Sequence, residues 1–420
     1  MLSLLSPTAE KWVAVSIFIA TFAAVLWRRV PIHYLSLGAA ALLVLLGIVP
    51  ADVALFQDVN WDVLAIYFGY GVLAAALTES GVPALLAYRI LLKTKKEKYA
   101  LLLLSGVAAA LSAFMPNPVV VLALAPLAIE MADRMESPLF LYLICPALAS
   151  NAVTTVSMVA DPPALILAAS TGMRFLDFYW FKGRPGLGTL SVIAVAVALL
   201  TLLVQLRRMN KKVALPAEKI EVSYGASLLF VLSVLALALI PTRHPGIIGL
   251  ILGVASILLV RHRWRAVLRE FDIRSMLFLA GIFVVVGSLD KVGAIMDFST
   301  WIKTIGASSS LATFVLLVWI SVGFSSFVDN VPYTVLMIPT CKYLAQMLGM
   351  SPYPFYYGML VGTGIGGNIT PVGATANVLA CGILEKRGQK VELAKYLKIS
   401  IPFTFAAVLA GQLLLQLFWL

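Results

Sequence analysis

Six long stretches of the sequence carry no charged residue, and apolar stretches recur to the last residue. The charge-free stretches are residues 14–27, 35–49, 187–206, 228–240, 247–260 and 311–322. Several approach the roughly 20 residues that cross about 30 Å of hydrocarbon as a helix. A lone N-terminal block would indicate a signal peptide, but the recurrence of such blocks excludes that interpretation. We therefore expect an all-α, polytopic integral membrane protein.

The balance of charge also favours a membrane protein over a nucleic-acid-binding one. Charged residues make up 12% of the chain and apolar residues 61%, whereas a soluble domain carries about 25% charged residues. The net charge of +11 comes from short loops between apolar stretches, where signals for membrane orientation belong. We expect the lipid bilayer of a bacterial or archaeal cytoplasmic (plasma) membrane as the partner, and no nucleic acid.

The chain repeats itself at an offset of about 213 residues, and such a repeat constrains the whole fold. LTESG at 77–81 matches LDKVG at 289–293, and FMPN at 114–117 matches FVDN at 327–330. In the same register Pro126 falls on Pro339, and residues 157–165 fall on 370–378. We therefore predict two transmembrane repeats, residues 1–206 and 224–420, joined by a linker at 207–223.

Basic residues predict which loops face the cytoplasm. They cluster at 28–29, 93–98, 207–212, 261–269 and 386–398. The loop at 52–62 is acidic, whereas its counterpart in the second half is the basic loop 261–269. Corresponding loops are thus expected on opposite sides, which is the pattern of inverted-topology repeats. This topology places the linker in the cytoplasm and both termini outside.

Each half contains two breaks in its apolar pattern, and irregular backbone is not tolerated against lipid. The first break is MPNP at 115–118 and VDNVP at 328–332. Proline removes a backbone donor and asparagine supplies donors and an acceptor, so we expect the tips of two re-entrant hairpins. The second break, at 150–163 and 362–377, is rich in Gly, Pro, Ser, Thr and Asn. It predicts broken helices that bind ions or small polar groups, although glycines alone also serve close helix packing.

Asp161 and Asp329 stand at the two kinds of break, in otherwise apolar surroundings. Ionisable residues at membrane depth are rare and mark ion pathways, so both are candidate proton carriers. Asp161 is equally well placed to cap a helix that begins at Pro162.

The sequence gives no support for a metal site or an enzyme. The three cysteines are far apart and lack metal-ligand spacing. His33, His244 and His262 fall near predicted helix ends, where we expect them at the membrane interface. An intramembrane enzyme would need a nucleophile–base pair or a cluster of metal ligands, and neither is visible.

The motifs at the breaks resemble the ion transporter superfamily. They are Asn151 and the DPP motif at 161–163 in the first half, and DNVP at 329–332 and GGNITPVGATAN at 366–377 in the second. This group includes arsenite permeases, NhaD-type sodium–proton antiporters, the melanosomal P protein and dicarboxylate or citrate–sodium symporters. The resemblance covers essentially the whole chain. It implies a scaffold part, a transport part with two re-entrant hairpins, and a homodimer.

The resemblance also implies which residues bind substrate or ion, with no cofactor besides the coupling ion, H⁺ or Na⁺. These residues are Asn117, Asn151, Thr155, Ser157, Asn330, Gly367, Asn368, Thr370 and Asn377. Family members often have Gly-Gly after the first Asn and Asn after Asp-Pro-Pro, where this chain has Val153-Thr154 and Ala164. These departures favour proton coupling or a single ion site. The second half keeps more of the polar pattern, so we expect it to bear more of the binding.

The leading hypothesis is a secondary active antiporter that exports a small inorganic anion or metalloid, arsenite or antimonite, in exchange for protons. The predicted breaks contain no Arg or Lys, which disfavours a multiply charged organic anion, whereas largely neutral arsenite suits an uncharged polar pocket. An arsenite exporter implies a soluble ATPase subunit as partner. The alternatives are a sodium–proton antiporter, a sodium-coupled dicarboxylate or citrate transporter and, from another class, a passive channel. Inverted repeats with broken helices favour alternating access over a channel.

Overall fold

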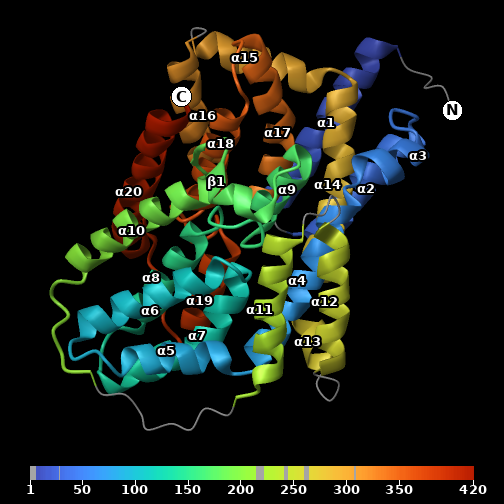
Figure 1. The fold of residues 1–420 in the computed structure, drawn as a ribbon. Coiled ribbons are helices and arrows are strands. Elements are labelled where there is room, and N and C mark those ends of the chain that lie inside the picture. The colour runs from blue at the N-terminus through green and yellow to red at the C-terminus, as the bar shows by residue number, and fades with distance from the viewer. Residues whose placement is uncertain (1–5, 28, 214–221, 241–244, 260–263, 307–308) are drawn as a thin grey trace.

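The computed structural model describes residues 6–27, 29–213, 222–240, 245–259, 264–306 and 309–420, and within them nearly all regular structure is helical (Figure 1). The first half comprises α1 (Pro7–Trp27), α2 (Ile32–Leu45), α3 (Ala51–Val53), the π-helical turn η1 (Ala54–Asp58), α4 (Trp61–Glu79), α5 (Val82–Leu91), α6 (Glu97–Ser112), α7 (Asn117–Arg134), α8 (Leu139–Ala152), α9 (Pro162–Thr171), the short turn η2 (Phe175–Phe178), the two-residue strands β1 (Trp180–Phe181) and β2 (Arg184–Pro185), which pair antiparallel, and α10 (Leu187–Gln205). The second half comprises α11 (Tyr224–Leu239), α12 (Pro245–Leu259), α13 (Trp264–Glu270), α14 (Ile273–Lys291), α15 (Ala294–Ile305), α16 (Ser310–Ser325), α17 (Asn330–Met347), α18 (Tyr353–Gly366), α19 (Thr375–Lys386) and α20 (Leu393–Trp419). The all-α prediction is confirmed.

Five of the described helices are long and apolar enough to cross a membrane, namely α1, α4, α10, α14 and α20. The helix α10 shows the physical reason: its 19 residues carry no charge, and at 1.5 Å per residue they extend about 28 Å. It ends at Gln205, two residues before Arg207, where a charged side chain can reach the membrane surface. The polytopic membrane fold is therefore confirmed.

Helix boundaries recur at the offset found in the sequence. The pairs α6 and α16, and α7 and α17, begin 213 residues apart, as do α9 and α19. The division into two repeats joined by a linker stays a prediction, and residues 214–221 of the predicted linker lie outside the described part of the chain. The inverted relation of the halves stays a prediction.

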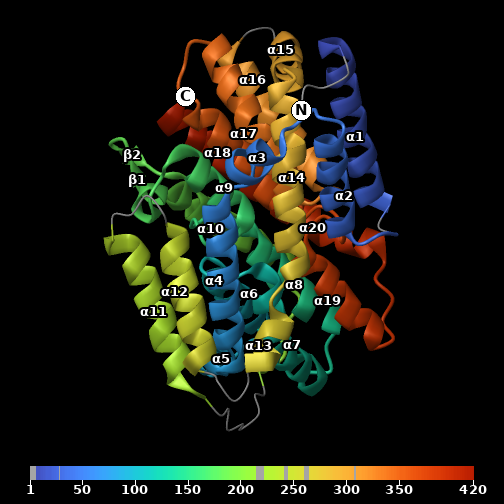
Figure 2. The same ribbon diagram turned by 90° about the vertical axis from the view of Figure 1, so that its right-hand side faces the viewer.

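The second helix of each half packs against the opposite half. The helix α2 lies along α14, and α12 lies along α4 (Figure 2). Gly249 and Gly253 of α12 form a small-residue stripe that faces Gly69, and a Cβ on Gly69 would lie only 1.9 Å from the Gly249 carbonyl oxygen. Such stripes let helix backbones approach closely in membranes. The reciprocal contact is what a two-fold relation between the halves would produce.

Several of the predicted cytoplasmic segments gather at one end of the molecule. Lys96 bridges to Lys212 as an isolated strand pair, and the Lys211 ammonium donates to the Glu136 carbonyl oxygen at 2.9 Å. The Arg387 guanidinium pairs with Asp133 at 3.3 Å. These contacts connect the loop after α5, the end of α7, the start of the linker and the end of α19.

Arg29 belongs to the first of the five basic clusters, and the cytoplasmic side of that cluster stays a prediction. Arg29 lines a cavity beside Asp272 and Asp329 at the start of α14 and α17. The turn after α1 is therefore folded against the second hairpin tip. Arg28, Arg261 and Arg263 lie outside the described residues.

A labelling experiment tests this topology. We expect Lys96→Cys and Lys386→Cys to react with a membrane-impermeant maleimide from the same side of the membrane, because their segments share one end of the molecule. Asp52→Cys, in the acidic loop, is the matched control and should react from the other side. The three native cysteines are buried and give little background. Labelling of positions 96 and 386 from opposite sides would contradict the predicted orientation.

Candidate functional site

The turns between α6 and α7 and between α16 and α17, which the sequence predicted as hairpin tips, meet the first helix break at a central cavity of about 320 Å³. The tip between α6 and α7 contributes two prolines, the break between α8 and α9 contributes residues 158–162, and α4 and α14 close the cavity from the scaffold side. Its polar lining consists of Tyr67, Tyr70, Asp161, Asp272, Ser275, Asp329, Asn330 and Thr375. Of the residues predicted from the sequence, Asp161, Asp329 and Asn330 line this cavity.

Local sequence sets the backbone at the second tip. Asp329 is the N-cap of α17, and its carboxylate accepts the backbone N–H of Val331 at 2.9 Å. This cap satisfies one of the four N–H groups that a helix start leaves without a partner. It also places Asn330 at the first position of α17, with its side chain toward the cavity.

Asp161 serves the first break differently. It precedes Pro162 and Pro163 at the start of α9 and has an extended backbone, but its side chain makes no capping hydrogen bond. Instead its Oδ2 accepts Nδ2 of Asn330 at 2.7 Å. The bond joins residues 169 positions apart, so it ties the first half to the second. A hydrogen bond to a charged group contributes about 1.5–3 kcal/mol.

Two matched hydroxyls fasten each tip to the break of its own half. The Ser157 hydroxyl donates to the Ala113 carbonyl, and the Thr370 hydroxyl donates to the Ser326 carbonyl. The second pair lies 213 residues after the first, which is the offset of the repeat. Each hydroxyl also accepts an N–H two residues on, a local pattern that stabilises irregular backbone. Ser157 and Thr370 therefore position the tips behind the cavity.

Four asparagines form a buried amide network beside the cavity. The side-chain nitrogen of Asn151 donates to Oδ1 of Asn368 at 3.2 Å, and Nδ2 of Asn377 donates to the same oxygen at 3.1 Å. Nδ2 of Asn117 lies 3.5 Å from Oδ1 of Asn151. Nδ2 of Asn368 donates to the Leu148 carbonyl oxygen at 2.8 Å. The network crosses between the halves, and its role in binding stays a prediction.

Two oxygens of this network have no hydrogen-bond partner within the described residues. They are Oδ1 of Asn117 and Oδ1 of Asn377, and both are buried. Buried polar atoms are nearly always satisfied by protein, water or ion. Amide oxygens are ligands for hard cations, so these two atoms are suited to a small cation or to an ordered water.

Two other predicted residues occupy different positions. Thr155 pairs with Ser191 of α10 at 2.7 Å, so its hydroxyl faces α10 and not the cavity. Gly367 lies at the end of α18, where a Cβ would meet the Gly373 carbonyl oxygen at 2.8 Å. Gly367 thus permits the close passage of the second break, which is a packing role.

The sequence interpretation missed the scaffold side of the cavity. Tyr67 and Tyr70 lie in the apolar helix α4, and nothing in their spacing distinguishes them from ordinary membrane aromatics. Asp272 caps α14 by accepting the N–H of Ser275 at 3.1 Å. This D-x-x-S spacing is a helix-start signal, and it could have identified the pair as the beginning of a helix but not as cavity residues.

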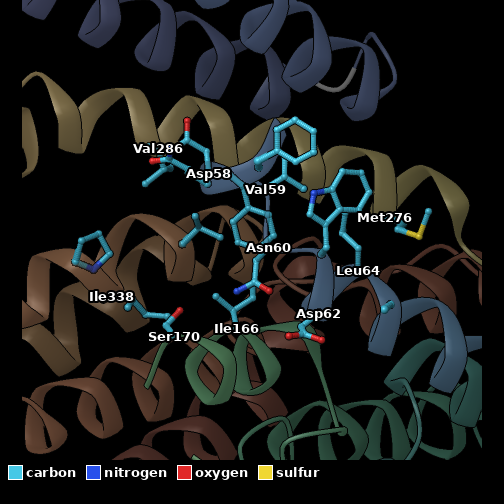
Figure 3. Close-up of a pocket in the computed structure, with 18 of the residues that line it drawn as sticks. Asp58, Val59, Asn60, Asp62, Leu64, Ile166, Ser170, Met276, Val286 and Ile338 are labelled. Carbon is cyan, nitrogen blue, oxygen red and sulfur yellow. The ribbon is translucent and has the colours of Figure 1, made fainter. Parts of the chain in front are cut away.

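A larger cavity of about 910 Å³ lies between η1, α4, α9, α14 and α17 (Figure 3). Asn60 and Asp62 at the start of α4 and Ser170 of α9 line it, together with Asp58 near Val286 of α14. Burial raises the pKa of Asp58 to about 6, and the nearby Lys291 opposes this shift. Asp58 therefore takes up a proton as the pH falls through about 6. Such an acidic lining favours protons and other cations over anions.

The fold resembles that of a solved transporter. The crystal structure of the Alcanivorax borkumensis YdaH transporter superimposes with a TM-score of 0.57 and 14% sequence identity, over 90% of this chain and 87% of that one. At this identity the likeness concerns the fold alone.

Relatives in sequence include proteins that are named as transporters. An uncharacterized transporter of Mycobacterium tuberculosis is 27% identical, over 96% of this chain and 98% of that protein. The human P protein is 25% identical over 90% of this chain, and the match spans 56% of its own length.

A family model described as "Citrate transporter" (CitMHS) matches residues 22–362, which is most of the chain. The matched region includes both hairpin tips, the first break and the central cavity apart from Thr375 and Leu379. The predicted resemblance to the ion transporter superfamily is confirmed, and so is the prediction of a transporter and not an enzyme. The chain belongs to the citrate transporter family and is a secondary membrane transporter.

Proposed function

We propose that the protein is a proton-coupled antiporter of a small weak oxyacid, with arsenite and antimonite as the first substrates to test. The observation that carries this proposal is the 2.7 Å hydrogen bond between Asp161 and Asn330. It joins the two halves at the cavity, where alternating access requires a contact that can change. Protonation of Asp161 removes the negative charge that Asn330 binds, so proton uptake weakens this contact.

The lining of the central cavity supports a neutral substrate. Three carboxylates, Asp161, Asp272 and Asp329, face it, and none of its described lining residues is basic. These carboxylates would repel a multiply charged anion in the cavity. Two like unit charges about 4 Å apart repel by about 4 kcal/mol at an effective dielectric of about 20. Arsenous acid is uncharged near neutral pH. Its hydroxyl groups can donate to the carboxylates and accept from Asn330.

Sodium–proton antiport is a second candidate, favoured by a separate observation. The orphan oxygens of Asn117 and Asn377 are buried within the amide network and offer ligands of the kind that hard cations prefer. A sodium ion bound at either oxygen would supply the partner that this oxygen lacks. The family's name favours citrate, but the carboxylate lining supports that substrate less well.

Vesicle transport separates these candidates. Purified protein in liposomes is given an outward or inward proton gradient, and arsenite flux and internal pH are followed together. We expect arsenite to move protons and sodium alone to leave the internal pH unchanged. Proton movement driven by sodium without arsenite would reject the proposal in favour of sodium–proton antiport. Citrate serves as the third substrate, and its exclusive transport would reject both.

A further inference from the structure

A third cavity adjoins the central one, and the charged residues that line it differ from those of the central cavity. It has a volume of about 500 Å³ and shares Ile32, Asp272, Ser275, Phe278, Asp329 and Thr375 with the central cavity. Beyond these residues it is lined by two arginines and a histidine, whereas the central cavity has no described basic residue. These residues are Arg29, Arg274 and His33. We call this space the arginine cavity.

The arginines come from elements that the sequence does not connect. Arg29 follows α1, and Arg274 lies in the first turn of α14. Neither guanidinium forms an ion pair with a carboxylate in the described part of the chain. The carboxylates in the cavity are engaged as helix caps, since Asp272 accepts from Ser275 and Asp329 accepts from Val331. The two guanidinium groups offset the charges of these two carboxylates, and the Arg29 guanidinium also lies 4.9 Å from the centroid of the Trp27 ring. Their N–H groups are the charged donors of the cavity.

His33 gives a second, independent sign of a ligand. The side chain is only 8% exposed, and its Nδ1 makes no hydrogen bond to any described residue. The sequence predicted a position at the membrane interface for this residue, and that position stays a prediction. A buried imidazole nitrogen without a partner costs free energy, and a rotation of the ring would bring it to an occupant of the cavity.

Helix ends add to the same preference. The first turns of α2 and α19 face the cavity through Pro31, His33 and Thr375. Neither helix has a side-chain hydrogen bond at its N-cap. Helix N-termini carry partial positive charge and unsatisfied N–H groups, and both attract anions.

We propose that the arginine cavity is an oxyanion-binding site, in which Arg29, Arg274 and His33 hold a phosphate or carboxylate group beside the second hairpin tip. The planar guanidinium matches both groups through paired hydrogen bonds. The group can belong to a free small anion or to an anionic lipid headgroup, because these present the same chemistry. The site does not depend on which substrate the central cavity carries.

Equilibrium binding tests this site without any transport. The protein is placed in nanodiscs of neutral phosphatidylcholine, and inorganic phosphate or citrate is titrated by calorimetry. We expect Arg29→Gln and Arg274→Gln each to weaken binding by roughly 10- to 100-fold, which is the effect of losing a hydrogen bond between charged partners. Arg274→Lys should recover part of the loss. Arg269→Gln, on the neighbouring α13, removes the same charge outside the cavity and should change nothing.

A second arm identifies the source of the oxyanion. Phosphatidylglycerol is added to the nanodiscs, and the midpoint of thermal unfolding is measured for the same variants. A rise in the midpoint that requires Arg29 and Arg274, without binding of phosphate or citrate, assigns the site to a lipid headgroup. The absence of any arginine-dependent effect in both arms would overturn the proposal. Because neither arm uses a gradient, failure of arsenite transport leaves this result unaffected.

Discussion

Replacing Asp161 with asparagine should leave the protein folded and abolish the response of transport to a proton gradient. The amide of the new side chain keeps an oxygen that can accept from Nδ2 of Asn330, so the contact at 2.7 Å survives in neutral form. The cost to stability is then only about 1 kcal/mol, the difference between a charged and a neutral hydrogen bond. The variant cannot take up or release a proton at this position. We expect gradient-driven flux to fall by roughly 100-fold, the scale of losing a positioned proton-transfer group.

The control for this prediction is Asp133→Asn. Asp133 pairs with Arg387 at 3.3 Å, and both side chains are exposed at the basic end of the molecule. Surface ion pairs contribute about 0–1 kcal/mol, so both flux and stability should match the wild type. Flux is measured in liposomes at equal protein density, and folding by size-exclusion chromatography. An Asp161→Asn variant that still responds fully to the gradient would show that the coupling proton binds elsewhere.

Asn330→Ala complements Asp161→Asn, because it removes the donor of the Asp161–Asn330 hydrogen bond and keeps the carboxylate. Asp161 then remains titratable but loses its contact with the second half. We expect the flux to retain its dependence on pH and to lose rate. Proton binding and the connection between the halves are thereby separated by experiment.

The sequence was most informative where local chemistry decides the backbone. Proline beside asparagine at 116–118, and Asp329 before Asn330, mark helix starts that need no tertiary information. The offset of 213 then predicted matched partners, and the Ser157 and Thr370 hydroxyls occupy matched positions. An internal repeat helps because each half serves as an independent observation of the same structural unit.

The sequence was least informative where distant elements meet. Arg29 follows the first apolar stretch and looked like an ordinary orientation signal, since the positive-inside pattern does not reveal which turn folds inward. Tyr67 and Asp272 reach the central cavity only because α4 and α14 pack beside the tips. Thr155 was assigned by its place in a motif, but its hydroxyl bonds to Ser191. Side-chain direction depends on packing that one sequence does not contain.

The largest effect on stability is expected from adding one methyl group at the second break. Gly373→Ala places a Cβ 2.6 Å from the Gly367 carbonyl oxygen and 2.8 Å from the carbonyl oxygens of both Ser325 and Ser326. All three obstacles are backbone atoms, so no side chain can turn aside to relieve them. Overpacking of a rigid site costs about 1–3 kcal/mol and occasionally more. We expect more than 3 kcal/mol here, with the protein failing to reach a stable folded state in mild detergent.

Gly323→Ala provides the matched control with the opposite sign. Gly323 lies inside α16, and a Cβ there would have no heavy atom within 4 Å. Alanine in a helix interior is more favourable than glycine by about 0.5–1 kcal/mol, so this variant should unfold at a slightly higher temperature than the wild type. Both variants make the same chemical change within 50 residues, and thermal unfolding in detergent compares them directly. If Gly373→Ala were as stable as Gly323→Ala, the second break would have to pass the hairpin tip at a greater distance. The Thr370 hydroxyl could then no longer reach the Ser326 carbonyl, and the arrangement that positions Asn330 at the cavity would be lost with it.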